Sequence, residues 1–263
     1  MLVQRVYRAL LRQAKQLEGH DLIAPLVAGS SQWGTHRFTK ADSAASDVLK
    51  DLAPGLDLDL LSAEHSTTTS MGSAWGREGM PLRQLISAAF RAQLLAPHEK
   101  QARLVEEAFR VLRILLEQRY LFRCSSSCVT EGVKVDVTAK FDQTAKDFRG
   151  EQVHVYTYRV RVTNLREEPI RVLGRSWTIK NDRGQPRVHI PLDPNNAVVG
   201  QQPLLPTGHT FEYFSGTDLD TISGLQSGAL LVDVFGEGRN KEATQRLIVE
   251  VAPFTLVPPG GTE

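Results

Sequence analysis

The sequence predicts an α+β protein of two domains, a helical bundle followed by an antiparallel β-sandwich. The main observation is a change in the spacing of the apolar residues. From Met1 to about Arg123 they recur every three or four positions, as on one face of a helix, and from about Thr130 to Leu256 they alternate with polar residues, as in strands. A chain of 263 residues has room for two ordinary domains. We expect a helical domain at 1–123, a linker at 124–129, a sandwich at 130–257 and a tail at 258–263.

The first predicted helix carries two stripes at helical spacing and is expected to end at Gly19. The apolar stripe consists of Val3, Val6, Tyr7, Leu10, Leu11, Ala14 and Leu17. The second stripe is wholly basic and consists of Arg5, Arg8, Arg12 and Lys15. Like charges at this spacing repel by about 0.2–0.5 kcal/mol per pair. The basic stripe is either a solvated face or a surface for an acidic partner, and we favour the partner because solvated faces usually mix both signs.

Two more predicted helices begin at Pro81 and Pro97, since proline suits the first helical turn. Their apolar positions are Leu82, Leu85, Ile86, Ala89 and Phe90 in one helix, and Leu104, Ala108, Val111, Leu112, Leu115 and Leu116 in the other. Together with the first helix they predict a three-helix bundle. Residues 19–80 are rich in Gly, Ser, Thr, Pro and Asp, with short amphipathic pieces near Lys40–Leu52, and we expect a mostly irregular insertion outside the bundle core.

The helical half contains Val6-Tyr7-Arg8, followed by Ala9-Leu10-Leu11-Arg12, and later Phe90-Arg91. In these motifs it resembles the LYR family of small mitochondrial proteins, over about residues 1–18 and 81–119. Val6 replaces the usual leucine, and the insertion is longer than usual. The resemblance implies a mitochondrial matrix protein that binds the acidic acyl carrier protein, with the partner's phosphopantetheine-linked acyl chain inside the bundle. The residues expected to contact it are Arg5, Tyr7, Arg8, Leu11, Arg12, Lys15, Phe90 and Arg91.

The C-terminal half contains seven or more short strands separated by polar turns, which predicts an antiparallel sandwich. The FGEGRN segment near Gly236 is interpreted as a hairpin turn. Three segments resemble the ApaG domain over about residues 130–256: RVTNLREEPIRVLGRSWTI, AVVGQQPLLPTGHTFEYFSGTDLDTISG and VAPFTL. The resemblance implies a fibronectin-like (immunoglobulin-like) sandwich that occurs as a bacterial protein and as a module of eukaryotic adaptors.

The segment FEYFSGTDLDTISG is interpreted as leading into a structured loop between strands. Gly216 and Gly224 would allow positive φ angles, and hydroxyl groups would hydrogen-bond the nearby backbone. Many ApaG domains carry G-x-G-x-x-G where this chain has NNAVVG, of which only Gly200 remains, so nucleotide or pyrophosphate binding is disfavoured. The candidate ligand or partner residues of this half are Gly200, Ser215, Gly216, Thr221, Ser223 and Gly224.

Several classes of function lack support in the sequence. The net charge of +1 gives no overall attraction to nucleic acid or anionic membranes, and no apolar run is long enough to span a bilayer. Cys124 and Cys128 are interpreted as free thiols in a reducing compartment rather than a disulfide or half of a zinc site. Asp218 and Asp220 have no histidine motif beside them. We expect no catalytic residue, no metal and no directly bound cofactor.

The sequence therefore favours a non-enzymatic mitochondrial accessory or assembly protein. Its helical half would bind acyl carrier protein, and its sandwich would bind a larger complex; respiratory complex I, the mitochondrial ribosome and the iron–sulfur machinery all stay open. The alternative is an ApaG-type module that binds a small phosphorylated ligand, a nucleotide or pyrophosphate, with the helices as an oligomerisation arm. A third hypothesis, a dinucleotide hydrolase, lacks metal ligands and a nucleophile motif.

Overall fold

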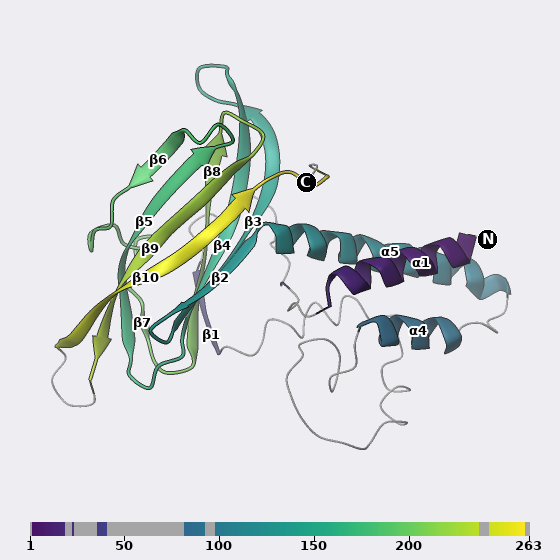
Figure 1. The fold of residues 1–263 in the computed structure, drawn as a ribbon, viewed down its shortest axis with the longest axis horizontal. Coiled ribbons are helices and arrows are strands. Elements are labelled where there is room, and N and C mark those ends of the chain that lie inside the picture. Colours follow the sequence, from purple (N-terminus) through teal and green to yellow (C-terminus); the bar gives the residue numbers. More distant parts are fainter. Residues whose placement is uncertain are drawn as a thin grey trace. The chain divides into compact units, whose positions relative to one another are not determined.

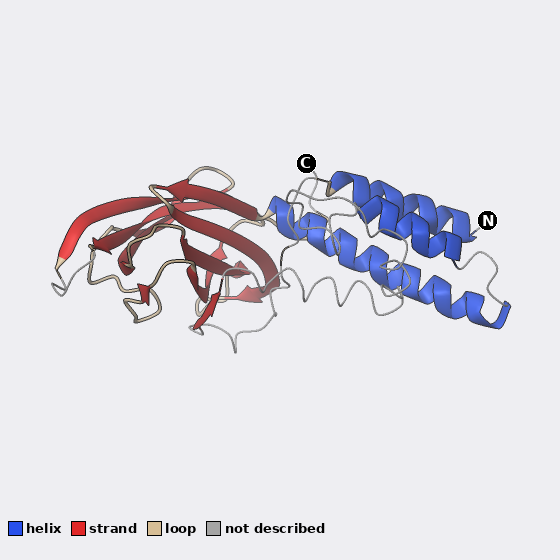
Figure 2. Cartoon of the chain, turned by 90° about the horizontal axis from the view of Figure 1, so that it is seen from below, coloured by secondary structure: helices blue, strands red, loops and turns tan. Residues whose placement is uncertain are grey.

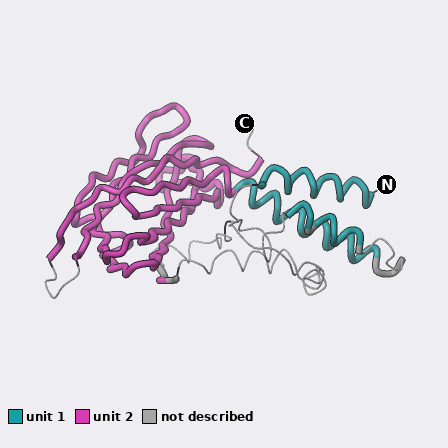
Figure 3. The backbone as a smooth tube through the Cα atoms, turned by 60° about the horizontal axis from the view of Figure 1, so that its bottom comes forward, with its two compact units in different colours: residues 1–25, 42–120 teal, residues 26–41, 121–263 magenta. Residues whose placement is uncertain are grey.

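The structure is a computed structural model of the chain, and it describes residues 2–18, 23, 36–40, 82–92, 98–236 and 242–260. The chain divides into two compact units, one formed by residues 1–25 and 42–120 and the other by residues 26–41 and 121–263 (Figure 3). Most of the expected insertion at 19–80, including the amphipathic pieces near Lys40–Leu52, lies outside the described residues, as does most of the turn predicted after Gly236.

The first unit contains helices α1 (Leu2–Gln16), α4 (Leu82–Ala92) and α5 (His98–Arg123), near the three places where the spacing predicts helices (Figure 1). One apolar cluster contains residues of all three helices. Its buried members are Val6, Leu10, Ala14, Leu17, Leu82, Ile86 and Leu115. Fully burying a Val, Leu or Ile side chain contributes about 1.5–3 kcal/mol, so this cluster is the main source of stability for the described helices.

A polar contact joins α5 to the segment that follows α1. The buried side-chain amide of Gln118 accepts a hydrogen bond from the main-chain N–H of Ile23 at 2.8 Å and donates one to the Ile23 carbonyl at 2.7 Å. Both polar atoms of the buried amide are thereby satisfied, as buried polar groups in native proteins generally are. Gln118 therefore fixes the backbone at Ile23 against α5.

The second unit is an antiparallel β-sandwich, as predicted, and every described strand pairing in it is antiparallel (Figures 1 and 2). One sheet has the order β1-β8-β4-β3-β2 and the other the order β10-β9-β5-β6, with β7 also paired to β5. The strands are β1 His36–Lys40, β2 Ser125–Thr130, β3 Val133–Lys146, β4 Gln152–Asn164, β5 Ile170–Asn181, β6 Pro186–Ile190, β7 Leu204–Leu205, β8 His209–Leu219, β9 Gly224–Phe235 and β10 Ala243–Leu256.

The alternation read from the sequence places the sandwich core correctly. On β3, four of the five apolar positions that alternate in the sequence, Val133, Val135, Val137 and Ala139, are buried, and the fifth, Phe141, is partly buried. The rings of Tyr158, Trp177 and Phe254, from β4, β5 and β10, have centroids 5.8–6.2 Å apart in an aromatic cluster between the two sheets. Trp177 meets Tyr158 and Phe254 edge-to-face, and such pairs add about 0.5–1.5 kcal/mol each to the gain from burial.

The expected linker at 124–129 is wrong, because Ser125–Thr130 forms β2 and pairs with β3. The serines lack the apolar alternation of a buried strand, but their hydroxyl groups bind neighbouring main-chain and side-chain groups. Ser125 Oγ donates a hydrogen bond to the Leu121 carbonyl at 2.7 Å and lies 2.9 Å from Thr138 Oγ1. The strands that follow α5 therefore begin at Ser125 rather than at about 130.

The insertion is also not irregular throughout, because His36–Lys40 forms β1. This strand pairs in register with β8, from His36 opposite Tyr213 to Lys40 opposite His209, and it belongs to the second unit. The local composition gives no sign of this strand, since its hydrogen-bonding partner lies far along the chain.

Candidate functional sites

The basic stripe of α1 is exposed. Arg5, Arg8, Arg12 and Lys15 are all solvent-exposed, and among the described residues none of them forms an ion pair. The stripe therefore presents cations whose charge the described chain leaves uncompensated. Arg91, at the end of α4, is exposed as well.

The two parts of the LYR-like motif lie together although they are far apart in sequence. The ring centroids of Tyr7 on α1 and Phe90 on α4 are 4.7 Å apart, and Tyr7 Oη lies 3.2 Å from Ser87 Oγ. Tyr7, Leu11 and Phe90 are partly buried and pack against the apolar cluster. The structure thus brings Tyr7 and Phe90 together and leaves Arg8 and Arg91 exposed to solvent.

The interpretation of FEYFSGTDLDTISG needs a correction. Ser215–Leu219 belongs to β8, so the connection to β9 is only Asp220–Ser223. Gly216 and Gly224 lie in strands, and neither has a positive φ angle. Gly224 is required for a different reason, because a Cβ there would collide with the Lys180 carbonyl oxygen. The sequence shows the glycine but not the neighbouring strand that approaches it.

Hydroxyl groups do brace the short β8–β9 connection. Thr221 Oγ1 donates a hydrogen bond to the Ser223 carbonyl at 2.7 Å and accepts one from the Asp182 N–H at 3.3 Å. Asp220 contacts two residues of the β5–β6 segment: its carboxylate lies 3.4 Å from Arg187 Nε and 3.3 Å from Asn181 Nδ2. The β8–β9 connection and the β5–β6 hairpin therefore form one hydrogen-bonded end of the sandwich.

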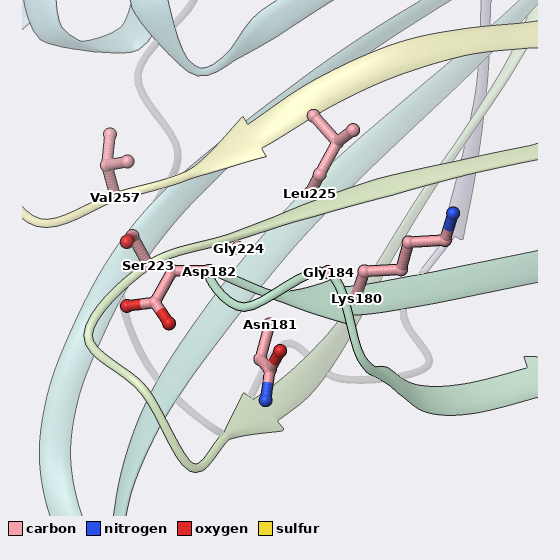
Figure 4. A pocket seen from close by; sticks show the side chains of 8 residues that line it. All are labelled: Lys180, Asn181, Asp182, Gly184, Ser223, Gly224, Leu225 and Val257. Carbon is pink, nitrogen blue, oxygen red and sulfur yellow. The ribbon is translucent and has the colours of Figure 1, made fainter.

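An open hollow of about 350 Å³ lies at this end of the sandwich (Figure 4). Its lining residues are Lys180, Asn181, Asp182, Gly184, Ser223, Gly224, Leu225 and Val257. Of the candidate residues predicted from the sequence, Ser223 and Gly224 line the hollow, whereas Gly200, Ser215 and Gly216 do not. Lys180 supplies one positive charge and Asp182 one negative charge, so the lining has no net attraction for an anion.

The segment around Gly200 forms a compact loop that uses its own amides. Asp193 Oδ1 accepts a hydrogen bond from the Asn195 N–H at 2.7 Å, and the main chains of Val198 and Gln201 bond each other in both directions. Val199 and Gly200 have φ angles of 45° and 77°, as in a tight turn. Because several amide donors are already paired within the loop, they are not free to cradle a phosphate.

A charge cluster on β4 and β8 was missed by the sequence analysis. The buried Glu212 carboxylate lies 3.3 Å from Arg161 Nε and 3.8 Å from Arg159 Nε. Arg159 and Glu212 are both 3% exposed. The available signal was the alternation of charged and apolar residues in Arg159-Val160-Arg161 and in Phe211-Glu212-Tyr213.

The remaining candidates are the two cysteines, metal sites and membrane-spanning helices. Cys124 and Cys128 are thiols that are not joined in a disulfide, the first buried and the second partly buried. Among the described residues, no group of three or more His, Cys, Asp or Glu side chains is placed to hold a metal ion, and no helix is long and apolar enough to cross a membrane. The C-terminal unit is therefore defined as a β-sandwich domain with a polar loop end.

The comparisons with known proteins identify this domain. Residues 145–233 match the sequence model of the ApaG domain. The chain is 35% identical over 136 residues to Protein ApaG of Anaeromyxobacter dehalogenans, covering 97% of that protein and 51% of this chain. It is 40% identical over 94 residues to Protein ApaG of Bordetella pertussis, covering 68% of that protein and 36% of this chain. The chain belongs to the ApaG family, and the resemblance seen in its C-terminal half is confirmed.

A solved structure described as the ApaA protein of Bordetella pertussis is similar to this chain with 32% sequence identity. The similarity covers 49% of this chain and 95% of that chain, with a TM-score of 0.41.

Proposed function

We propose that this protein is a non-enzymatic accessory or assembly protein of the mitochondrial matrix. Its helical unit binds acyl carrier protein, and its ApaG domain binds a larger complex. The observation that supports the carrier-protein role most directly is the contact between Tyr7 and Phe90, with ring centroids 4.7 Å apart, beside an exposed stripe of cations. This contact joins the two sequence elements on which the LYR resemblance rests.

The charges on α1 suit an acidic partner. An acyl carrier protein presents acidic side chains and the phosphate of its phosphopantetheine arm. Arg8 and Arg12 are exposed one helical turn apart, so both cations can face the same partner surface. Complementary charges of this kind speed association and fix its orientation. The matrix location follows from the proposed partner.

The apolar side of the site suits the acyl chain. Tyr7, Leu11 and Phe90 are partly buried at the border between the basic stripe and the apolar cluster. An acyl chain that enters beside Phe90 would leave water and contact these apolar side chains. Each buried methylene would stabilise the complex by about 0.8 kcal/mol. The acyl-phosphopantetheine is supplied by the partner, and the chain itself holds no cofactor in this proposal.

The experiment uses the full chain, co-expressed with a mitochondrial acyl carrier protein and purified by a tag on the chain. The variant carries Arg8→Glu and Arg12→Glu, and the matched control carries Arg103→Glu and Arg113→Glu, which reverse two exposed cations of α5. Intact mass spectrometry of the purified complex reports the bound carrier protein and its acyl chain. We expect the wild type and the control to retain the partner and the Arg8/Arg12 variant to lose at least 90% of it.

Each reversal replaces an attraction with a repulsion, which costs several kcal/mol at an interface. Equal retention by all three proteins would reject the carrier-protein proposal. The same result would leave the basic stripe as a solvated face.

A second candidate function, binding of a small phosphorylated ligand by the ApaG domain, is favoured by the hollow that holds Lys180 and Ser223. Asp182 in the same lining opposes it, and so does the paired state of the amides around Gly200. Calorimetric titration of the full chain with pyrophosphate and with nucleotides separates the two functions. We expect no binding at millimolar ligand, and saturable micromolar binding would establish the second function instead.

A further inference from the structure

Helices α1 and α4 pack side by side in opposite directions. Tyr7, in the first half of α1, contacts Phe90 near the end of α4, with ring centroids 4.7 Å apart. Glu18, just after α1, forms an ion pair of 3.4 Å with Arg83 at the start of α4. These two contacts fix the directions of both helices, so the line along which they meet, which we call the α1–α4 seam, has two distinct ends.

The side chains along the α1–α4 seam change in character from one end to the other. Arg8 and Arg91 are the sequence neighbours of the two paired rings, and both are exposed cations. Buried members of the apolar cluster follow toward the other end of the seam: Leu10, Ala14, Leu82 and Ile86. The seam therefore leads from positive charge to buried apolar side chains.

A pair of hydroxyl groups lies between these two regions. Tyr7 Oη is 3.2 Å from Ser87 Oγ, and both side chains are partly buried. Each hydroxyl has one proton to donate, and the bond between them uses only one of the two protons. Among the described residues neither hydroxyl has another hydrogen-bond partner. One proton of the pair is therefore available to an acceptor that enters the seam.

The phosphopantetheine arm of an acyl carrier protein carries its chemical groups in the same order as the seam. Its phosphate comes first, its amides and the thioester carbonyl follow, and the alkyl chain is last. The phosphate suits the exposed arginines, and the alkyl chain suits the apolar cluster. The carbonyl oxygens between them are hydrogen-bond acceptors, which is the kind of group that the remaining hydroxyl proton needs.

We propose that Ser87 and Tyr7 together bind a carbonyl oxygen of the phosphopantetheine arm, so that Ser87 is a further residue of the carrier-protein site. One hydroxyl donates to the carbonyl, and the bond between the two hydroxyls holds that donor in place. A donor that is already held loses less freedom on binding than an isolated side chain. The inference rests on the carrier-protein role proposed above and names the part of the partner that this pair recognises.

The alternative role of the hydroxyl pair is to join the two helices without contacting a ligand. Loss of the Ser87 hydroxyl would then weaken the helical unit and lower its affinity for every form of the partner to the same degree. A binding role changes the affinity only for the form that carries the arm. The two roles are therefore separated by comparing the partner with and without its arm.

The test uses the full chain and a mitochondrial acyl carrier protein in two forms, an apo form without the arm and an acylated form whose phosphopantetheine carries a decanoyl chain. Calorimetric titration at low ionic strength, where contacts between exposed charges are strongest, measures both affinities. Ser87→Ala and Tyr7→Phe each remove one hydroxyl, and Ser87→Thr keeps it. The matched control is Gln84→Ala, an exposed position of the same helix. Thermal unfolding verifies that each variant is folded.

We expect Ser87→Ala and Tyr7→Phe each to weaken binding of the acylated form about fivefold, as the loss of one hydrogen bond implies, and to leave binding of the apo form unchanged. The double variant should lose less than the product of the two single losses, because the hydroxyls act as a unit. Ser87→Thr and Gln84→Ala should bind both forms as the wild type does. An equal loss for both forms, or no loss for the acylated form, overturns the inference.

The inference and the carrier-protein proposal fail separately. A wild type that binds the acylated form, together with a Ser87→Ala variant that binds it equally well, rejects the hydroxyl pair alone. A wild type that binds neither form rejects the carrier-protein role and, with it, the inference that rests on that role.

Discussion

The hydroxyl of Tyr156 donates a hydrogen bond to the main-chain carbonyl of Ile222 and so ties the β8–β9 connection to the sandwich core. Tyr156 is fully buried on β4, whereas the Ile222 side chain is 54% exposed in the connection. The Tyr156 hydroxyl therefore holds the backbone of the connection at Ile222, whose own side chain packs little against the core. The bond also positions the neighbouring Ser223, which lines the hollow.

The first prediction concerns this bond. Tyr156→Phe removes the donor and leaves a carbonyl without its partner, which should lower the free energy of unfolding by about 1–2 kcal/mol. Urea denaturation followed by circular dichroism measures the change. Faster amide exchange at residues 220–223 should accompany it, and an unchanged unfolding midpoint would show that water replaces the phenol without cost.

The second prediction concerns Tyr213, whose hydroxyl is buried and has no hydrogen-bond partner within the described part of the chain. Leaving such a group unpaired costs about 1–3 kcal/mol. Tyr213→Phe removes the hydroxyl and keeps the ring, so this variant should be at least as stable as the wild type. Its change in the free energy of unfolding should therefore not have the sign expected for Tyr156→Phe. A clear loss of stability in urea denaturation would mean that the Tyr213 hydroxyl is satisfied.

The third prediction is a loss of stability at alkaline pH. Burial raises the pKa of both Tyr156 and Tyr213 well above the ordinary value near 10. The unfolded chain then loses these protons first, so stability is complete below about pH 10 and falls as pH rises toward the higher folded pKa values. Unfolding midpoints in urea at about pH 9 and pH 10.5 should differ less in Tyr213→Phe than in the wild type. An equal difference in both proteins would exclude Tyr213 as a source of the effect.

The fourth prediction concerns Val199, a β-branched residue with a φ angle of 45°. This region costs an ordinary residue about 1–2 kcal/mol, and asparagine tolerates it better. Val199→Asn should therefore raise the free energy of unfolding by about 1 kcal/mol. The neighbouring change Gly200→Ala, at a φ of 77°, should have the opposite effect. Thermal unfolding of both variants checks the signs, and two shifts in the same direction would contradict the strain argument.

The fifth prediction concerns the buried charges on β4 and β8. Glu212→Ala leaves the guanidinium groups of Arg159 and Arg161 without this carboxylate and should destabilise by about 3–5 kcal/mol. The matched control is Glu168→Ala, which removes the more exposed partner of Arg166 and should cost much less because solvent screens that pair. Denaturant unfolding compares the two, and similar small losses would show that water reaches Glu212.

The sequence predicts those parts of the fold that depend on local periodicity. Val133, Val135 and Val137 alternate with polar residues, and this pattern alone places them in the core. The helices follow from apolar residues at three- and four-residue spacing. The family of the sandwich follows from motifs distributed along its whole length.

Features that depend on distant neighbours could not be predicted. β1 is a strand because β8 accepts it, and Gly224 is a glycine because the Lys180 carbonyl lies against it. No local pattern indicates that Arg159 is buried beside Glu212. Of the candidate site residues, Tyr7 and Phe90 lie in contact although they are far apart in the sequence, whereas the glycine turns predicted at Gly216 and Gly224 do not occur.

The unequal burial of the two cysteines gives the protein a natural point of attachment for a spectroscopic label. Cys124 is 1% exposed, whereas Cys128 lies partly exposed on β2 with its sulfur 3.9 Å from Glu250 Oε2 on β10. A maleimide dye or a nitroxide should therefore react at Cys128 while the folded chain shields Cys124. A label at that position would report on the junction of β2 and β10 without any engineered cysteine, and the rate at which Cys124 becomes reactive would report on the opening of the core.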